Sequence, residues 1–532
     1  MRKIFLYGPP GSGKSTVGKI LAKKLDVEFL DVDTEIEVLN SMSIAGIVSE
    51  FGWQVFRDKE SELIREICTH EDDKTLKYRH YGVIALGGGA LLRAENRELC
   101  ENSGSVILLY ADYSALVSRI SLDEKARPLL EGEEEEKLWS LLEDRRNHYD
   151  SFEMRVATSE PSPFIENISP DIISNEIQKK IGRYRVTSMG QGYDVIVQPG
   201  GLHELGNMLR ERYLGGPIVI VSDMNISKIY ADLVRRSCIA AGFSTQLVAI
   251  QPGENFKTLD TVSKLWQDFL NAGLDRKSTV IALGGGVVGD LAGFAASTYM
   301  RGCNWVTVPT SLLSMVDASM GGKTGFDLPE GKNLIGSFYS PRFVLADPEV
   351  LATLPDEEFR SGLAEVVKHG IISDPDLFEL CSQGFEKIKL DITSIVARAM
   401  SVKVEIIEKD PYEKGLRAAL NLGHTIGHAV ELASNYHLRH GEAVSIGMVA
   451  EARLAERLGL SKPGSNISEI IKKSLHNIGL PTEIPPELSQ TVIIEAMRKD
   501  KKKEKNFINF ALPLDIGDVK INVALDDLEK VL

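Results

Sequence analysis

The sequence predicts an α/β fold through about residue 345 and a mainly α-helical region after it. Short apolar runs alternate with amphipathic stretches in the first part, as is typical of βαβ units built around a parallel sheet. Two of these runs end in glycine-rich turns that lead directly into helical patterns. After Pro348, strand-like runs stop until residues 507–512, and long helical patterns take over.

The order of the predicted elements divides the chain into three domains. The clearest strands are expected at residues 3–7, 83–86, 106–110, 218–222, 280–283 and 305–308. Three prolines between 157 and 183, followed by a short helical pattern and Gly182, predict a boundary near residue 182. We therefore expect domains at 1–182, 183–345 and 346–532, which suits a chain of 532 residues.

Composition excludes several classes of protein. A hydrophobic content of 43% is sufficient for real cores, and no run of eighteen apolar residues predicts a membrane span. The net charge of −15 argues against nonspecific nucleic-acid binding, which requires a basic surface. Five scattered cysteines without a C-x-x-C pair indicate reduced thiols, and hence a cytoplasmic protein. With the hydropathy and the net charge, this predicts that neither a membrane nor a nucleic acid is a partner.

The first glycine-rich turn carries a nucleotide-binding motif. Residues 8–15, GPPGSGKS, fit G-x-x-x-x-G-K-[ST] between an apolar strand and a helical pattern. The N–H groups of such a loop and the helix N-terminus cradle phosphates. Lys14 is expected to reach the β- and γ-phosphates, and the Ser15 hydroxyl to bind Mg²⁺.

Residues that could define a second substrate follow this motif. Asp31 and Asp33 lie two residues apart at a predicted strand end, where both would share one face and point at one phosphate–metal centre. The alternative is a helix cap followed by a surface acid. Arg57, Arg127 and Arg145 add guanidinium groups, although any one of them alone is typical of a surface. The sequence VIALGGG, which occurs at 83–89 and again at 280–286, lets backbone approach a ligand closely.

Together these motifs resemble the shikimate kinases. GPPGSGKST, FLDVDTEIE, FGWQVFRDKE, VIALGGGA, ARPLL and EDRRNHY occur in that family's order across about residues 1–180. The resemblance implies a P-loop kinase of the nucleoside-monophosphate-kinase type, with a parallel sheet, that transfers the γ-phosphate of ATP to the 3-hydroxyl of shikimate. Two departures are Asn147, where the family often has proline, and an unusually long polar segment before residue 83.

The resemblance also implies residue roles. ATP would be bound by Gly11, Ser12, Gly13, Lys14, Ser15, Thr16 and Arg127. Shikimate would be bound by Asp33, Arg57, Gly87, Gly88, Gly89 and Arg145. Asp33 would accept the hydroxyl proton, Ser15 and Asp31 would serve Mg²⁺, and Arg127 would close onto the phosphate from a lid. Lys14, Asp33 and Arg127 are thus the catalytic candidates.

Histidines provide the main signal in the remaining chain. His424 and His428 lie at i and i+4 on one helical face, His440 follows, and Glu365 precedes them. Two histidines and one carboxylate with an open fourth position form a catalytic zinc site. Three histidines and one glutamate are available for three ligand places, so one histidine could instead form hydrogen bonds or act as an acid or base. A lone histidine would more often be structural.

The residues between 250 and 333 suggest a nucleotide and an anion. The stretch VIALGGGVVGDLAGF is strand, glycine turn and helix, but it only approaches a dinucleotide fingerprint. Glu254 and Lys257 follow an apolar run, where a carboxylate could accept ribose hydroxyls, or where an ordinary helix cap could lie. Basic residues recur within glycine-rich motifs and favour a small anionic substrate: Arg301, Lys323, Lys332, Lys368, Lys403, Arg417 and Lys501.

These motifs resemble 3-dehydroquinate synthases over about residues 185–520. PGENFK, VPTSLLSMVDASMGGKTG, GKNLIGSF, SGLAEVVKHG, NLGHTIGHAVE and HGEAVSIGM occur in that family's order. The resemblance implies a Rossmann-like NAD domain followed by a mainly α-helical metal domain. It implies Glu365, His424 and His440 as ligands of Zn²⁺ or Co²⁺, with His428 handling a proton or orienting the substrate.

The remaining roles are likewise implied by this resemblance. NAD⁺ would be bound by Glu254, Lys257, Gly285, Gly286, Val287, Gly289, Asp290, Thr310, Ser311, Asp317, Lys323 and Lys332. The substrate would be bound by Arg301, Lys323, Asn333, Lys368, Lys403, Arg417, Asn421, His428 and Lys501. Of these, Lys323, Lys368, Lys403, Arg417 and His428 would take part in catalysis.

The implied function is bifunctional. The second activity would convert 3-deoxy-D-arabino-heptulosonate 7-phosphate to 3-dehydroquinate and phosphate, with NAD⁺ consumed and regenerated in each turnover. We also consider a metal-dependent polyol dehydrogenase for the C-terminal half and a non-catalytic nucleotide-binding regulatory module for the N-terminal half. The expected partners are small anionic molecules and, through the synthase part, a second copy of the chain.

Overall fold

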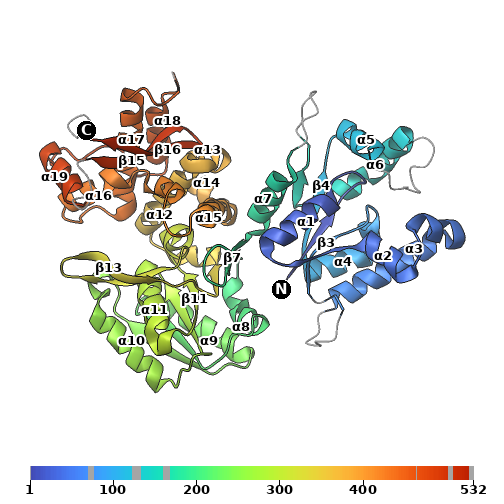
Figure 1. Cartoon of the computed structure of the whole chain (residues 1–532), viewed down its shortest axis with the longest axis horizontal. Coiled ribbons are helices and arrows are strands. Elements are labelled where there is room, and N and C mark those ends of the chain that lie inside the picture. The colour runs from blue at the N-terminus through green and yellow to red at the C-terminus, as the bar shows by residue number, and fades with distance from the viewer. Residues whose placement is uncertain are drawn as a thin grey trace. The chain divides into compact units, whose positions relative to one another are not determined.

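The computed structural model describes residues 2–69, 77–78, 80–122, 134–159, 168–462, 464–500 and 507–526. Contacts within the chain divide it into two compact units, Met1–Ile181 and Gly182–Leu532. Figure 1 shows the helices and strands of each unit.

The first unit contains a five-stranded parallel sheet in the order β2-β3-β1-β4-β5. Its strands are β1 (Lys3–Tyr7), β2 (Glu28–Asp31), β3 (Tyr81–Ala85), β4 (Gly104–Tyr110) and β5 (Arg155–Ala157). Its α-helices are α1 (Lys14–Leu25), α2 (Val32–Asn40), α3 (Ile44–Cys68), α4 (Ala94–Ser103), α5 (Tyr113–Ser121), α6 (Glu134–Asp150) and α7 (Pro170–Ile181).

Helices cover both faces of this sheet because its strands are apolar on both sides. Phe5 and Tyr7 of β1 belong to one buried cluster, and Ile4 and Leu6 belong to another. Successive strand residues point to opposite faces, so β1 is central and buried throughout. The glycine-rich loop follows the carboxyl end of β1 and therefore lies where the parallel strands end.

The second unit begins with a seven-stranded sheet in the order β6-β7-β14-β11-β10-β8-β9. The strands are β6 (Arg183–Val186), β7 (Tyr193–Val197), β8 (Ile218–Asp223), β9 (Thr245–Ile250), β10 (Thr279–Gly284), β11 (Asn304–Pro309) and β14 (Phe343–Ala346). All neighbours are parallel except β6 and β7. Its helices are α8 (Gly201–Glu211), α9 (Asp232–Ala240), α10 (Leu259–Asn271) and α11 (Gly286–Thr298).

Strand order reverses at β8, because β9 and β10 lie on its opposite sides. Ligands of open α/β sheets bind in the crevice at the carboxyl ends of strands where the order reverses. The glycine turn after β10 lies at this point. The predicted Rossmann-like architecture is therefore confirmed.

The remaining chain is mainly helical, as predicted. It comprises α12 (Asp356–Ser373), α13 (Pro375–Ser382), α14 (Phe385–Leu390), α15 (Ile392–Lys409), α16 (His424–Ala433), α17 (His440–Arg457), α18 (Ile467–Asn477) and α19 (Gln490–Asp500). Helix α12 is buried along most of its length and packs against α15 and α17. None of the helices in the described ranges is long and apolar enough to cross a membrane.

Two antiparallel hairpins complete the unit. The run expected at 507–512 is part of β15 (Ile508–Asp515), which pairs with β16 (Asp518–Leu525). Sequence analysis missed a hairpin of β12 (Lys323–Leu328) and β13 (Gly331–Phe338), because its basic and glycine-rich residues resemble loops. This hairpin packs against α11.

Candidate active sites

The loop after β1 has the geometry of a phosphate cradle. Gly11 and Gly13 adopt left-handed φ angles of 78° and 86°, which favour glycine. A β-carbon on Gly8 would lie 2.1 Å from the Leu109 carbonyl oxygen, so this position tolerates no side chain. The Lys14 ammonium donates to the carbonyl oxygens of Gly8 and Pro9 at 2.8 and 3.0 Å. The loop therefore presents its backbone and one cation at the N-terminus of α1, where an anion binds well.

The prediction that Asp31 and Asp33 share one strand face is wrong. Asp31 ends β2 and caps α2, since its carboxylate accepts from Thr34 N at 3.2 Å, and Asp33 lies in the first turn of that helix. The cap starts a helix where we expected a continuing strand. The Ser15 hydroxyl nevertheless donates to Asp31 Oδ2 at 2.5 Å, so the two Mg²⁺ candidates lie together. Oxygen donors of this kind suit Mg²⁺.

The three glycines after β3 lie against the shikimate candidates. A β-carbon on Gly87 would lie 2.8 Å from Asp33 Oδ1, and one on Gly89 would lie 2.5 Å from Arg57 Nη2. Arg145 Nη1 donates to the Gly88 carbonyl oxygen at 2.8 Å. Segments far apart in the sequence therefore converge on one glycine turn.

Electrostatics at this turn favour a proton acceptor. Burial and the neighbouring Asp31 carboxylate raise the pKa of Asp33 to about 6, against the opposing charges of Lys14 and Arg57. A carboxyl group with this pKa is ionised near neutral pH and accepts a proton more readily than an ordinary aspartate. Arg127 and the expected lid lie outside the described residues.

Glu60 also lies in this site, although no sequence motif predicted it. Its side chain is fully buried, and Arg57 Nη1 donates to its Oε2 at 2.5 Å. Oε1 lies 2.6 Å from where a β-carbon on Gly87 would be. Burial raises the pKa of Glu60 to about 7, although Arg57 lowers it. The only available signal was the i,i+3 spacing of Arg57 and Glu60 on α3.

The second glycine turn leaves space for a ligand. Gly285 precedes the first turn of α11, and a β-carbon there would come no closer than 3.7 Å, to Ser311 Oγ. A β-carbon on Gly289 would meet nothing within 4 Å. Val287 lies in the first turn of α11, and Thr310 follows the end of β11. The open space beside these residues fits a dinucleotide at the helix N-terminus.

Three of the NAD candidates form a charged cluster beside this turn. The Lys257 ammonium lies 2.7 Å from Asp290 Oδ2 and 4.0 Å from Glu254 Oε1. Lys257 also donates to Asn333 Oδ1 at 2.5 Å. Asn333, which we expected to bind the synthase substrate, therefore lies with the NAD candidates. Burial opposes the charge on Lys257, but Asp290, Glu254 and Asp327 keep its pKa raised.

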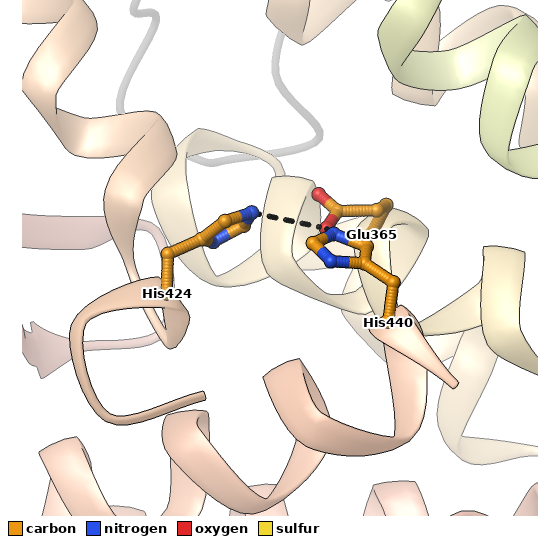
Figure 2. Close-up of side chains that lie close together, drawn as sticks. All are labelled: Glu365, His424 and His440. Carbon is orange, nitrogen blue, oxygen red and sulfur yellow. Dashed lines mark hydrogen bonds and ion pairs between the residues drawn. The ribbon is translucent and has the colours of Figure 1, made fainter. Parts of the chain in front are cut away.

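The predicted metal ligands meet across three helices (Figure 2). Glu365 is fully buried on α12, and His424 and His440 are the first residues of α16 and α17. Glu365 Oε1 lies 3.4 Å from His424 Nε2 and 3.3 Å from His440 Nε2. Ligand atoms of the three residues lie within 4.8 Å of one another. Two imidazoles and one carboxylate at this spacing fit Zn²⁺ or Co²⁺.

The surroundings of Glu365 keep it ionised. Burial would raise its pKa, but the Lys368 ammonium, His424 and His440 hold the pKa well below the usual range. Burial and Lys368 lower the pKa of His424 to about 3, so its imidazole is neutral, as metal binding requires. The His428 ring lies 5.2 Å from that of His424 and 5.8 Å from that of His440.

The cations expected at the synthase site are largely paired with acids. Lys368 contacts Glu365, and Lys403 contacts Asp317. Asp317, which we expected along NAD, therefore lies beside a substrate candidate. Burial would raise the pKa of Asp317, but Lys403 and Lys368 lower it, so this carboxylate is ionised.

Glu413 joins two other cations and was not predicted. Its carboxylate contacts Lys323 and lies 3.1 Å from Arg417 Nε. Lys323 and Arg417 are 94 residues apart, and only the fold brings them together. A β-carbon on Gly321 would lie 2.4 Å from Arg417 Nη2, so the glycine makes room for the guanidinium.

Four other predicted residues have no counterpart among the contacts described so far. Arg301 is exposed on η4 (Tyr299–Arg301), beyond the C-terminal end of α11. At 1.5 Å per residue, the 13 residues of α11 put it roughly 20 Å along the helix from the glycine turn. Asn421 is exposed at the end of η7 (Leu416–Asn421), and Lys501 lies outside the described residues. Lys332 points toward the helical part, where its ammonium lies 3.9 Å from Glu431 Oε1.

Three family models match successive parts of the chain. Residues 10–181 match the shikimate kinase model, 247–361 match the 3-dehydroquinate synthase N-terminal model, and 362–503 match its C-terminal model. The 3-dehydroquinate synthase of Rippkaea orientalis is 45% identical over 337 residues, which cover 62% of this chain and 92% of the relative. The Nostoc sp. enzyme is 44% identical over 353 residues, 64% of this chain and 96% of the relative.

Two solved structures resemble the second part of the chain. A 2-deoxy-scyllo-inosose synthase complexed with carbaglucose-6-phosphate, NAD⁺ and Co²⁺ has a TM-score of 0.60 and 25% identity, covering 65% of this chain and 98% of the other. The 2-epi-5-epi-valiolone synthase of Streptomyces hygroscopicus, with NAD⁺ and Zn²⁺ bound, has a TM-score of 0.57 and 28% identity, covering 65% and 97%. Both solved structures contain bound NAD⁺ and a divalent metal ion.

Proposed function

We propose residue roles for a chain that belongs to the 3-dehydroquinate synthase family and carries a shikimate kinase domain in residues 10–181. The chain is a bifunctional enzyme of the shikimate pathway. One activity phosphorylates shikimate with ATP. The other converts 3-deoxy-D-arabino-heptulosonate 7-phosphate to 3-dehydroquinate and phosphate.

In the kinase unit, the proposed roles follow the charge on each group. Bound ATP with Mg²⁺ supplies the phosphoryl group and neutralises its developing charge. The loop N–H groups and Lys14 hold phosphate oxygens, and Ser15 and Asp31 offer oxygens to the metal ion. Arg57 and Arg145 bind the shikimate carboxylate, for which a planar guanidinium is well suited. Asp33 Oδ1 or Oδ2 accepts the proton of the attacking hydroxyl.

In the synthase unit, residues of the NAD domain and the helical region share the work. When bound, the metal ion would supply a Lewis acid for a substrate hydroxyl, and NAD⁺ would supply a reversible hydride acceptor. Glu365, His424 and His440 hold the ion, and Glu254, Lys257 and Asp290 hold the nucleotide. Lys368, Lys403 and Arg417 bind the phosphate and carboxylate of the substrate and restrict its conformations. His428 holds or moves a proton at an imidazole nitrogen.

One observation carries the synthase proposal: the convergence of Glu365, His424 and His440 beside buried lysines. A phosphorylated keto acid needs both a Lewis acid and several cations, whereas a polyol needs only the metal and NAD⁺. The buried Lys368 and Lys403 therefore favour the synthase over a polyol dehydrogenase.

The full-length chain allows both activities to be tested in one preparation. We expect ADP release with ATP, Mg²⁺ and shikimate, above a control that lacks shikimate. We also expect phosphate release from 3-deoxy-D-arabino-heptulosonate 7-phosphate with NAD⁺ and Zn²⁺, without accumulation of NADH. No shikimate-dependent ADP release would contradict the kinase role. NADH accumulating with an alcohol, and no phosphate release, would contradict the synthase role.

The proposal extends to partners and location. A net charge of −15 and five cysteines that are all free and buried support action in the cytoplasm without nucleic acid or a membrane. We include self-association through the synthase unit. Light scattering on the purified chain tests this, and a monomer mass across the micromolar range would contradict it.

A further inference from the structure

A second carboxylate lies beside the metal-ligand cluster. Glu431 is on α16, seven residues after His424 and three after His428, so all three residues share one face of the helix. Only 13% of its side chain is exposed. The proposed chemistry assigns it no role.

The two oxygens of Glu431 face different partners. Oε2 lies 3.6 Å from His440 Nδ1, and Oε1 lies 3.9 Å from the Lys332 ammonium. The other nitrogen of the same imidazole, Nε2, faces Glu365 Oε1 at 3.3 Å. His440 is thus held between two carboxylates, and only Nε2 is directed toward Glu365 and His424.

This arrangement matches a general feature of metal sites. A histidine that binds a metal through one nitrogen commonly donates its other N–H to a carboxylate, which fixes the tautomer and the ring orientation. Here Glu431 Oε2 lies on the Nδ1 side of His440, at 3.6 Å, where it can attract a proton on Nδ1 and leave Nε2 to face Glu365. His424 receives similar support from backbone, since its Nδ1 lies 3.1 Å from the Leu422 carbonyl oxygen.

Lys332 connects this carboxylate to the β12–β13 hairpin. Lys332 reaches Glu431, while the adjacent Asn333, whose φ is 55°, accepts from Lys257 in the NAD cluster. The Lys332 ammonium also lies 4.5 Å from the centre of the Tyr436 ring, which stabilises its position.

We propose that Glu431 is a positioning residue that orients His440 for metal binding and joins that ligand to the β12–β13 hairpin through Lys332. The inference rests on the proposed metal site. Glu431 does not touch the substrate in this proposal and acts through His440.

The competing arrangement places the ion elsewhere. His428, Glu431 and His440 also bring ligand atoms within 4.8 Å of one another. Glu365 is the better ligand because it is fully buried and faces an Nε2 atom of each of two histidines. The experiment must therefore separate a positioning carboxylate from a ligand.

Zn²⁺ affinity of the full-length chain provides the test, measured by competition with a chromophoric chelator. We expect Glu431→Gln to weaken Zn²⁺ binding about 10- to 100-fold while one ion per chain still binds, as is usual when such a supporting carboxylate is lost. Lys332→Met should weaken binding less, because it removes only the partner of Oε1. Circular dichroism and thermal unfolding of the same preparation report that the synthase unit is folded.

Glu442→Gln is the matched control. Like His440, Glu442 lies in the first turn of α17. Its carboxylate accepts from Arg439 N at 2.8 Å and does not contact His440. We expect its Zn²⁺ affinity to stay within twofold of the wild-type value. The absorption spectrum of the Co²⁺-loaded chain should change for Glu431→Gln and not for Glu442→Gln.

Three results would overturn the inference. A Glu431→Gln affinity within twofold of wild type would overturn it alone. Stoichiometric binding that survives His424→Ala but is abolished by Glu431→Gln would place the ion on Glu431 instead. A wild-type chain that binds no Zn²⁺ would overturn the proposed metal site together with this inference.

Discussion

Two carboxylates at the kinase site and two at the metal site lie in opposite electrostatic settings. In the kinase unit, burial raises the pKa of Asp33 to about 6 and that of Glu60 to about 7. In the synthase unit, Lys368 and Lys403 help to hold the pKa values of Glu365 and Asp317 below their usual range. The kinase thus keeps acids that accept protons near neutral pH. At the metal site, Glu365 and Asp317 stay charged and can serve as a ligand or as a partner of cations.

The largest expected effect tests whether Glu365 serves the synthase alone. Glu365→Gln removes the charge that the ion requires, and loss of the ion removes several kcal/mol of transition-state stabilisation. We expect phosphate release to fall by about 10³-fold or more. Kinase turnover in the same chain should not change, and a parallel fall in both activities would indicate misfolding. Chelation of Zn²⁺ in the wild-type chain should reproduce the same selective loss.

The converse variant affects only the kinase unit. Asp33→Asn removes the proton acceptor, and we expect kcat for shikimate phosphorylation to fall about 10²- to 10⁴-fold. Phosphate release by the synthase should remain at its wild-type rate. A kcat within threefold of wild type would show that Asp33 does not accept the proton.

A third variant tests the paired charges of the synthase unit by stability. Lys403→Met leaves Asp317 without its closest cation, and unpaired buried charges are costly. Because 30% of the Asp317 side chain is exposed, we expect a loss of only about 1–3 kcal/mol. Urea unfolding followed by far-UV circular dichroism measures it. The double variant with Asp317→Asn should recover part of the loss, and no recovery would argue against the pair.

The smallest expected effect is the pH dependence of the kinase. Because Asp33 must be ionised, kcat/KM should fall about tenfold per pH unit below about pH 6. An unshifted aspartate would instead hold activity down to about pH 4. The profile of kcat/KM for shikimate between pH 4.5 and 8 decides between them.

The free energy of unfolding of the kinase unit should change with pH in the opposite direction and fall as the pH rises. Asp33 and Glu60 bind protons more tightly folded than unfolded, since both pKa values are raised. Their contribution is present below about pH 4 and is lost as pH rises through 6 to 7. Glu60→Gln should flatten this decline.

Local patterns were sufficient for much of both sites. The cradle of residues 8–15 is contiguous, so its strand, loop and helix were readable from spacing. His424 and His428 occupy one helical face, as i,i+4 spacing requires. The family resemblances then named the residues that these patterns could not connect.

Pairings across the fold were not readable in this way. Asp31 caps a helix because a side chain can satisfy an amide three residues ahead, and the alternation of polar residues did not distinguish this from a strand. Glu60 lies among the shikimate candidates only because α3 packs beside the Gly87 turn. Glu413 and Glu431 meet their cations across distant segments.

The sequence by itself determined the two fold classes, the phosphate cradle and the helical face that His424 and His428 share. These depend on periodicity and on motifs whose residues are neighbours along the chain. Only the tertiary structure decided which acid neutralises which cation, that Asn333 lies with Lys257, and that Glu431 supports His440. Charges interact through space over a few ångströms, and the chain separation of Glu365 and His440 contains no information about that distance.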